Sequence, residues 1–255
     1  MHVCRLSDQC LVDMFNTPEK IVTPKGIHCF SVLIILGGIT MNNQTKKLTT
    51  VGMLCAIAYA AAAVGRIPLV LFLKYDPKDI VIAIGGLIFG PLTSFFIALT
   101  VSLVEMVTIS ENGILGFFMN VISSCSFACT AAFIYKKKRK LSGAMVGLFC
   151  GWGCMVLVML FWNYLITPFY MGYPREAVIE LLIPAFLPFN FIKGGLNASI
   201  TMILYKPVVT ALRRSHLIET AQVTEKSRLN VGVILAALFI MATCILFILS
   251  FKGVF

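Results

Sequence analysis

Long apolar segments separated by short basic blocks constrain this chain more than any other feature of its sequence. Several of these segments approach the roughly 20 residues that an α-helix needs to cross a bilayer. Hydrophobic residues make up 59% of the chain and charged residues only 13%, whereas soluble domains carry about 25% charged residues. The sequence therefore predicts an all-α integral membrane protein, with no room for a separate soluble catalytic domain.

The apolar pattern predicts a six-helix bundle within residues 41–214, followed by an extra C-terminal transmembrane helix at 229–251. A polar, cytoplasmic linker at 215–228 joins the two parts. The six expected spans cover approximately residues 48–65, 80–90, 92–109, 114–135, 142–165 and 178–212. Gly90-Pro91 is expected to break the second span from the third. Short, interrupted membrane segments tend to line substrate cavities, which favours a solute-handling protein over a plain anchor.

Residues 1–40 differ from the rest of the chain. They are mostly polar at first and end in an apolar run, 29–39, that is too short to span comfortably. Met41 then opens a polar, basic stretch before a clean apolar helix. We interpret residues 1–40 as an extension that is not native, with Met41 as the true start.

Basic residues set the expected orientation. They are concentrated at Lys46-Lys47, at 136–140 and around Arg213-Arg214, which all lie on one side of the membrane if the N-terminus is cytoplasmic, as the positive-inside rule requires. The sequence therefore predicts a multi-pass protein of the cell membrane. The net charge of +10 is explained by these loops, so we expect the lipid bilayer and not nucleic acid as the surrounding partner.

Asn190 and Lys193 lie three residues apart inside a strongly apolar region. On a helix this spacing places both side chains on one face. A charge at membrane depth usually faces a partner or a polar cavity, so the pair indicates hydrogen bonding to a polar ligand. The alternative is that Lys193 extends to the lipid headgroups and Asn190 caps a helix after Pro188.

Familiar catalytic and energy-coupling motifs are absent from the sequence. It contains no GxxxxGK[ST] phosphate loop, no GxSxG nucleophile elbow and no HExxH zinc helix. The cysteine pairs at i, i+4 spacing have no histidine nearby, so we expect neither a metal site nor a resident cofactor. We expect a binding protein that takes its energy from elsewhere and is not an enzyme; a proton-coupled secondary transporter using Glu105 is the alternative.

The first span carries alanines in small-xxx-small pairs, which let another helix approach closely. They predict a docking surface for a partner, with packing inside the bundle as the alternative; the residues are Ala56, Ala58, Ala60 and Ala62.

Several motifs together carry a family resemblance. They are Phe72-Leu-Lys-Tyr-Asp-Pro-Lys-Asp-Ile80, Gly85-Gly-Leu-Ile-Phe-Gly-Pro91, Gly113-Ile-Leu-Gly-Phe-Phe-Met-Asn120, Asn163-Tyr164 and Pro188-Phe-Asn-Phe-Ile-Lys-Gly194. Residues 41–214 resemble the substrate-binding S-components of energy-coupling factor (ECF) vitamin transporters, and among them the riboflavin-specific type. Such proteins have six spans, so the helix at 229–251 departs from the family pattern.

The resemblance implies riboflavin as the transported ligand, bound with high affinity from outside under a lid formed by the connection after the first span. It also implies partners, namely an ECF transmembrane coupling subunit and two ATPase subunits. The alanine surface would then dock the coupling subunit. The same fold with another vitamin or small metabolite as ligand is the alternative.

The resemblance also assigns roles to single residues. Asn190 and Lys193 match the positions that hydrogen-bond the flavin ring, and Asn163 is expected to add a further ring contact. Further expected binding residues are Lys74, Asp76, Gly116, Asn120 and Tyr164. Simpler interpretations stay open for some of them: a mutual ion pair for Lys74 and Asp76, interhelical hydrogen bonding for Asn120, and an ordinary interfacial tyrosine for Tyr164.

Overall fold

A computed structural model describes residues 43–70, 73–109, 113–138, 141–172, 174–215, 217 and 231–251. The chain divides into two units at Lys46, and the second unit, Lys47–Phe255, carries nearly everything described. The extension at 1–40 and most of the linker at 215–228 lie outside the described residues.

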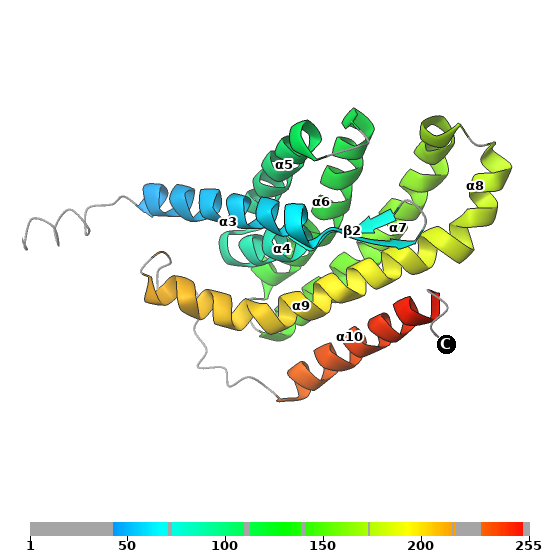
Figure 1. The fold of residues 1–255 in the computed structure, drawn as a ribbon. Helices are drawn as coiled ribbons and strands as arrows, with labels where there is room; N and C mark the ends of the chain where they lie inside the picture. The colour runs from blue at the N-terminus through cyan, green and yellow to red at the C-terminus, as the bar shows by residue number, and fades with distance from the viewer. Residues whose placement is uncertain are drawn as a thin grey trace, which may run out of the picture. The chain divides into compact units, whose positions relative to one another are not determined.

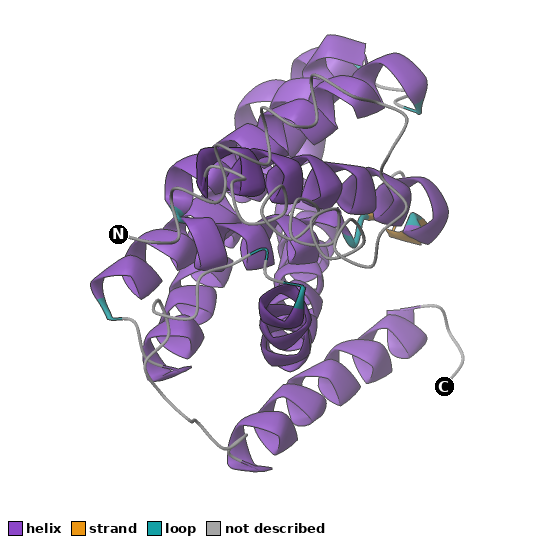
Figure 2. Ribbon diagram, turned by 90° about the vertical axis from the view of Figure 1, so that its left-hand side faces the viewer, coloured by secondary structure: helices purple, strands orange, loops and turns teal. Residues whose placement is uncertain are grey.

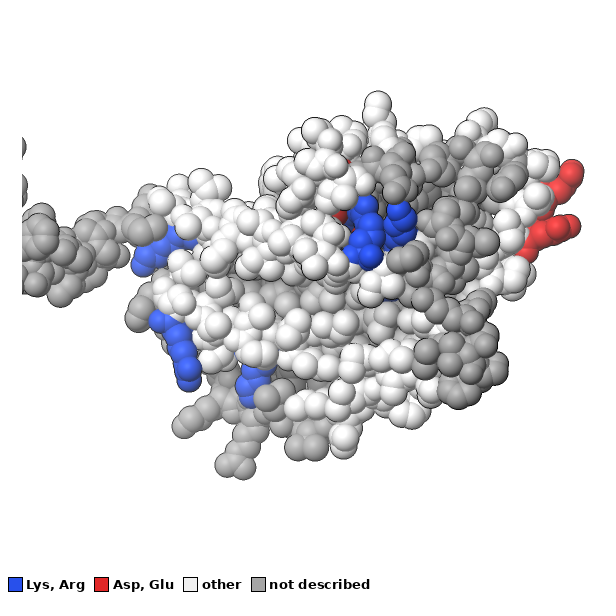
Figure 3. All heavy atoms as spheres, in the orientation of Figure 1, with Lys and Arg blue, Asp and Glu red and all other residues white. Residues whose placement is uncertain are grey.

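Five helical segments of the described chain are long and apolar enough to cross a membrane. They are α3 (Asn43–Gly65), α5 (Pro91–Thr108), α6 (Gly113–Lys137), α7 (Leu141–Met171) and the run of α8 (Arg175–Leu181), η1 (Leu182–Phe186) and α9 (Leu187–Arg214) (Figure 1). The chain is therefore an all-α, multi-pass membrane protein, and the face seen in Figure 3 is dominated by uncharged side chains.

The second expected span, 80–90, corresponds to α4 (Lys78–Phe89), which is too short to cross the membrane by itself. Its 12 residues of α-helix extend only about 18 Å, well short of the ~30 Å hydrocarbon core. The predicted break after it is confirmed: Gly90 has φ +100°, and Pro91 begins α5 at the first helical position. A positive φ favours glycine because it has no Cβ.

The connection between α3 and α4 contains two short strands, which the sequence did not predict. β1 (Ile67–Val70) and β2 (Leu73–Tyr75) pair antiparallel, with Ile67 opposite Tyr75. Arg66 and Asp76 lie together at the open end of this pair, directly before β1 and directly after β2. The strands therefore fix the segment that was expected to act as a lid (Figure 2).

Prolines mark two irregular places in the late helices. The sixth expected span is continuous, but it contains a π-helical turn at Leu182–Phe186 around Pro184. The fifth span was expected to end near residue 165, which would leave Pro168 in a loop, and this was wrong: Pro168 lies inside α7, which continues to Met171. A proline inside a helix removes a backbone hydrogen bond and crowds the carbonyl four residues before it, and α7 ends three residues after Pro168.

Glycines and small residues bring α6 and α7 into close contact. A Cβ on Gly147 would lie 2.6 Å from the carbonyl oxygen of Ala131. On the other side of the bundle, α10 (Val231–Phe251) packs against α9. The main apolar core lies between α3, α4, α5, α6 and α7, and includes Leu54, Ile82, Ile97, Phe127 and Met155.

Candidate ligand-binding site

A cavity of about 250 Å³ opens beside β2 and is lined by side chains from α6, α7 and α9. Its apolar lining consists of Leu73, Leu115, Met119, Met159, Trp162, Ile166 and Phe189. Its polar lining consists of Arg66, Lys74, Asp76, Asn120, Ser123, Asn163, Thr167, Asn190 and Lys193. An apolar pocket with a few convergent polar groups is the usual form of a small-molecule site.

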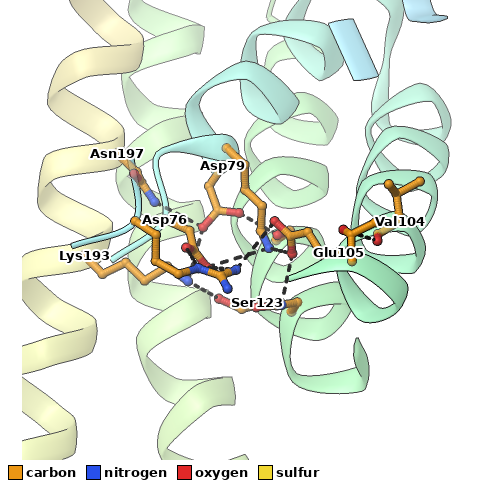
Figure 4. Close-up of polar contacts among 12 residues, drawn as sticks. Asp76, Asp79, Val104, Glu105, Ser123, Lys193 and Asn197 are labelled. Atoms are coloured by element: carbon orange, nitrogen blue, oxygen red, sulfur yellow. Dashed lines mark hydrogen bonds and ion pairs between the residues drawn. The ribbon is translucent and has the colours of Figure 1, made fainter. Parts of the chain in front are cut away.

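Lys193 is buried at the cavity wall and is held by two partners. Its Nζ lies 3.3 Å from Asp79 Oδ2 and donates to Ser123 Oγ at 3.2 Å. Figure 4 shows Asp79, Lys193 and Asn197 converging between α9 and its neighbours. The ammonium is therefore kept inside the protein and does not extend to the lipid headgroups. An ion pair with further hydrogen bonds is the arrangement that makes a buried charge tolerable.

Asn190 lies one turn before Lys193 on α9 and also lines the cavity. Its Nδ2 donates to the carbonyl oxygen of Phe186 at 2.8 Å. Its Oδ1 is buried and accepts no hydrogen bond from the described residues. Buried polar atoms are normally paired, so this acceptor suits a donor on a ligand.

Asn163 stands across the cavity on α7, and its local contacts fix its orientation. Its Nδ2 donates to the carbonyl oxygen of Met159 at 2.8 Å, and its Oδ1 accepts from Thr167 Oγ1 at 3.2 Å. Both Asn163 and Thr167 line the cavity. The carbonyl oxygen has a second lone pair, which leaves capacity for one further donor.

A cluster of charges lies at the open end of the β1–β2 pair, and of its members Asp76 was predicted as a binding residue, whereas Arg66 and Lys78 were not. Arg66 Nε donates to Asp76 Oδ1 at 2.7 Å. Lys78 is fully buried; it pairs with Glu105 and lies 3.8 Å from Asp76 Oδ2. Asn120 Nδ2 donates to Glu105 Oε2 at 3.2 Å, the interhelical role that was left open for it.

Asp79 connects this region to α9 and β2. It accepts hydrogen bonds from Ser124 and from Asn197, and Asn197 in turn accepts one from the hydroxyl of Tyr75 at 2.9 Å. Burial, with the nearby carboxylates of Asp79 and Asp76, raises the pKa of the Tyr75 phenol. The phenol therefore stays protonated and remains a hydrogen-bond donor.

The structure gathers most of the predicted binding residues. Seven of the eight line the cavity: Lys74, Asp76, Gly116, Asn120, Asn163, Asn190 and Lys193. Tyr164 does not line it and is 38% exposed. It follows Asn163 directly on α7, so its side chain leaves the helix about 100° further round.

The four alanines of α3 do not share one environment. Ala58 and Ala62 are fully buried, whereas Ala56 and Ala60 are exposed. Ala58 packs in the main core with Ile82 and Ala83 of α4. Burial therefore removes Ala58 and Ala62 from the predicted docking surface, and only Ala56 and Ala60 stay accessible.

Comparison with known proteins places this architecture in one family. Residues 46–205 match the family described as "ECF transporter, substrate-specific component". The riboflavin transporter RibU of Staphylococcus aureus is 29% identical over 180 residues, which is 67% of this chain and 94% of that protein. The riboflavin transporter FmnP of Bacillus subtilis is also 29% identical, over 68% of this chain and 99% of its own length.

Solved structures agree with this assignment. A structure titled "Structure and mechanism of the S component of a bacterial ECF transporter" superposes with a TM-score of 0.57 at 29% sequence identity. It covers 67% of this chain and 99% of the solved one. With more than half of its length matched by the family model, the chain belongs to the substrate-specific components of ECF transporters.

Proposed function

We propose that this protein binds riboflavin from outside the cell and delivers it to the cytoplasm as the substrate-specific subunit of an ECF transporter. Two relatives named as riboflavin transporters support the choice of ligand. The cavity supports it independently, because seven residues expected from the resemblance to riboflavin-specific S-components line one site.

One observation carries the proposal: the side-chain carbonyl oxygen of Asn190 and the ammonium of Lys193 lie at one wall of a cavity lined by both apolar and polar side chains. Asn190 Oδ1 is buried and accepts no hydrogen bond from the described residues, and Lys193 Nζ is on the same helix face. The flavin ring has an uracil-like edge that offers both an N–H donor and carbonyl acceptors. Its dimethylbenzene end is apolar and suits Trp162 and Phe189, which line the same cavity.

From the membership in the ECF family we infer that transport requires a coupling subunit and two ATPase subunits, which is consistent with a sequence that has no phosphate loop. The exposed alanines Ala56 and Ala60 are the proposed contact with the coupling subunit, because small residues allow close helix approach. The proposed orientation has a cytoplasmic N-terminus, which places the β1–β2 pair outside.

A proton-coupled secondary transporter using Glu105 is less well supported. The Glu105 carboxylate pairs with Lys78 and lies 3.8 Å from Arg66 Nη2. Lys78 and Asn120 already engage this carboxylate, so the charge cluster explains Glu105 without a role in proton transfer. Transport that persists without ATPase subunits and collapses with the proton gradient would reverse this judgement.

Riboflavin binding is tested first with the purified full-length protein. A yellow preparation with flavin absorbance bands and quenched fluorescence is expected. Asn190→Leu keeps the volume and removes the open acceptor, so we expect riboflavin Kd to rise about 10- to 100-fold, the range for an unpaired buried donor. Thr201→Val is the matched control, because Thr201 is buried on α9 away from the cavity.

Two outcomes would contradict the proposal. If the protein is colourless and does not quench the fluorescence of added riboflavin, riboflavin is not its ligand. The S-component fold would be unaffected, and other vitamins would be tested next. Equal riboflavin affinity in Asn190→Leu and Thr201→Val would remove Asn190 from the binding site. A Kd that rises in Asn190→Leu alone supports the assigned contact.

A further inference from the structure

α10 lies beyond the part of the chain that matches the family, which ends at residue 205. It is an uncharged helix that packs along α9 (Figure 1). Only one of its faces takes part in this contact. The residues on that face recur at helical spacing and join a buried cluster with Ile192 and Leu196 of α9; they are Ile240, Met241, Cys244 and Ile248.

The contact is built into the turn of α9 that carries Lys193. A Cβ on Gly195 would lie 2.9 Å from Cys244 Sγ, a distance that real Cβ atoms essentially never show. The adjacent Gly194 makes the same kind of room for Trp152 of α7. These two successive glycines therefore allow α7 and α10 to pack closely against α9. They directly follow Lys193, which lines the cavity.

β2 belongs to the same cluster. Tyr75 is 7% exposed and packs with Ile192, Leu196 and Cys244. Its neighbours in the chain, Lys74 and Asp76, both line the cavity. α10 thus packs against both α9 and β2 through this cluster. α9 supplies Asn190 and Lys193 to the cavity, and the β2 segment supplies Lys74 and Asp76.

We propose that α10 is a brace that keeps the β1–β2 pair closed against α9, and that Ile240, Cys244 and Ile248 are positioning residues for ligand retention. Opening the pair requires Tyr75 to leave the cluster, so weaker packing of α10 makes opening more frequent. The effect on ligand release rests on the proposed riboflavin function, whereas the effect on the β1–β2 pair does not.

The test compares two double variants of the full-length protein. Ile240→Ala with Ile248→Ala removes apolar volume from the face of α10 that packs on α9. Phe239→Ala with Leu246→Ala is the matched control, because these side chains are 71% and 57% exposed on the same helix. Hydrogen exchange of the β1 and β2 amides is measured without ligand, and riboflavin dissociation is followed by the recovery of flavin fluorescence.

We expect the first variant to exchange its β1 and β2 amides faster and to release riboflavin about fivefold faster or more, a usual size for coupling between two sites. The control variant should match the unmodified protein in both measurements. Unchanged exchange in the first variant, or faster exchange with unchanged release, would overturn the proposal. If the first variant exchanges faster but the unmodified protein does not bind riboflavin, the role of α10 as a brace is supported and the proposed function is refuted.

A cross-link tests the same contact without removing any packing. In Gly195→Cys the new Cβ would lie near the ~3 Å from Cys244 Sγ that a disulfide of ordinary geometry requires. The oxidised protein is expected to exchange its β1 and β2 amides more slowly than the same protein after reduction. Failure of the disulfide to form, or equal exchange in the two states, would overturn the proposal.

Discussion

Breaking the buried pair between Lys193 and Asp79 should destabilise the protein strongly even when no ligand is present. The two residues lie on α9 and α4, and their side chains are 8% and 0% exposed. Lys193→Met leaves Asp79 with hydrogen bonds from Ser124 and Asn197 but with its nearest cation gone. Asp79→Asn leaves the Lys193 ammonium with Ser123 as its remaining hydrogen-bond partner.

The magnitude follows from burial. Removing one member of a buried ion pair costs about 3–5 kcal/mol, because the other charge is left uncompensated, whereas replacing both members is often close to neutral. Each single variant should therefore lower the free energy of unfolding by about 3 kcal/mol. The double variant should lose less than either single variant, so the two effects should not add.

The assay is reversible unfolding in mixed detergent micelles without riboflavin, which separates folding from ligand contact. The four proteins of the cycle are measured together with Lys136→Met, which removes an exposed lysine of α6 and should leave unfolding unchanged. If the double variant loses the sum of the two single effects, Lys193 and Asp79 do not stabilise each other and the reasoning is refuted.

Two further predictions follow from backbone and surface features. Gly90→Ala should lower the free energy of unfolding by about 1–3 kcal/mol, because φ is +100° there. Gly153→Ala should raise it by up to about 1 kcal/mol, because this helical glycine has no atom within 4 Å of an added Cβ; changes of the same sign in thermal unfolding would contradict this. Ala56→Trp with Ala60→Trp should abolish co-purification with the coupling subunit but keep riboflavin binding. Ala236→Trp, on the exposed face of α10, should keep both, and loss of co-purification in it would argue against a specific docking surface.

Apolar length predicted the long helices, whereas proline positions were a mixed guide, since Pro168 lies inside α7. The break at Gly90-Pro91 and the long segment around Pro184 both follow from local chemistry. The β1–β2 pair did not, because Ile67–Val70 and Leu73–Tyr75 are too short to show strand periodicity. Their pairing depends on tertiary contacts such as the bond between Tyr75 and Asn197.

The candidate site was predicted in part. Asn190 and Lys193 stand out because polar groups are rare in an apolar helix. Lys78 and Asp79 were overlooked, since charges at the start of a span usually belong to a solvated connection. Their burial follows from partners far along the chain: Glu105 for Lys78, and Lys193 for Asp79. The sequence shows only that Lys78 and Asp79 directly precede the apolar run that begins at Ile80.

The ion-pair cluster beside the cavity contains equal numbers of cations and carboxylates. Three cations lie among three carboxylates in contacts of 3.8 Å or less; they are Arg66, Lys78 and Lys193 with Asp76, Asp79 and Glu105. A single unbalanced charge moving through the membrane potential exchanges about 2.3 kcal/mol of electrical work per 100 mV. Because this cluster is neutral as a whole, its displacement along the membrane normal, together with an uncharged ligand, does almost no electrical work. The rate of uptake should therefore be governed by ATP and indifferent to the voltage across the membrane.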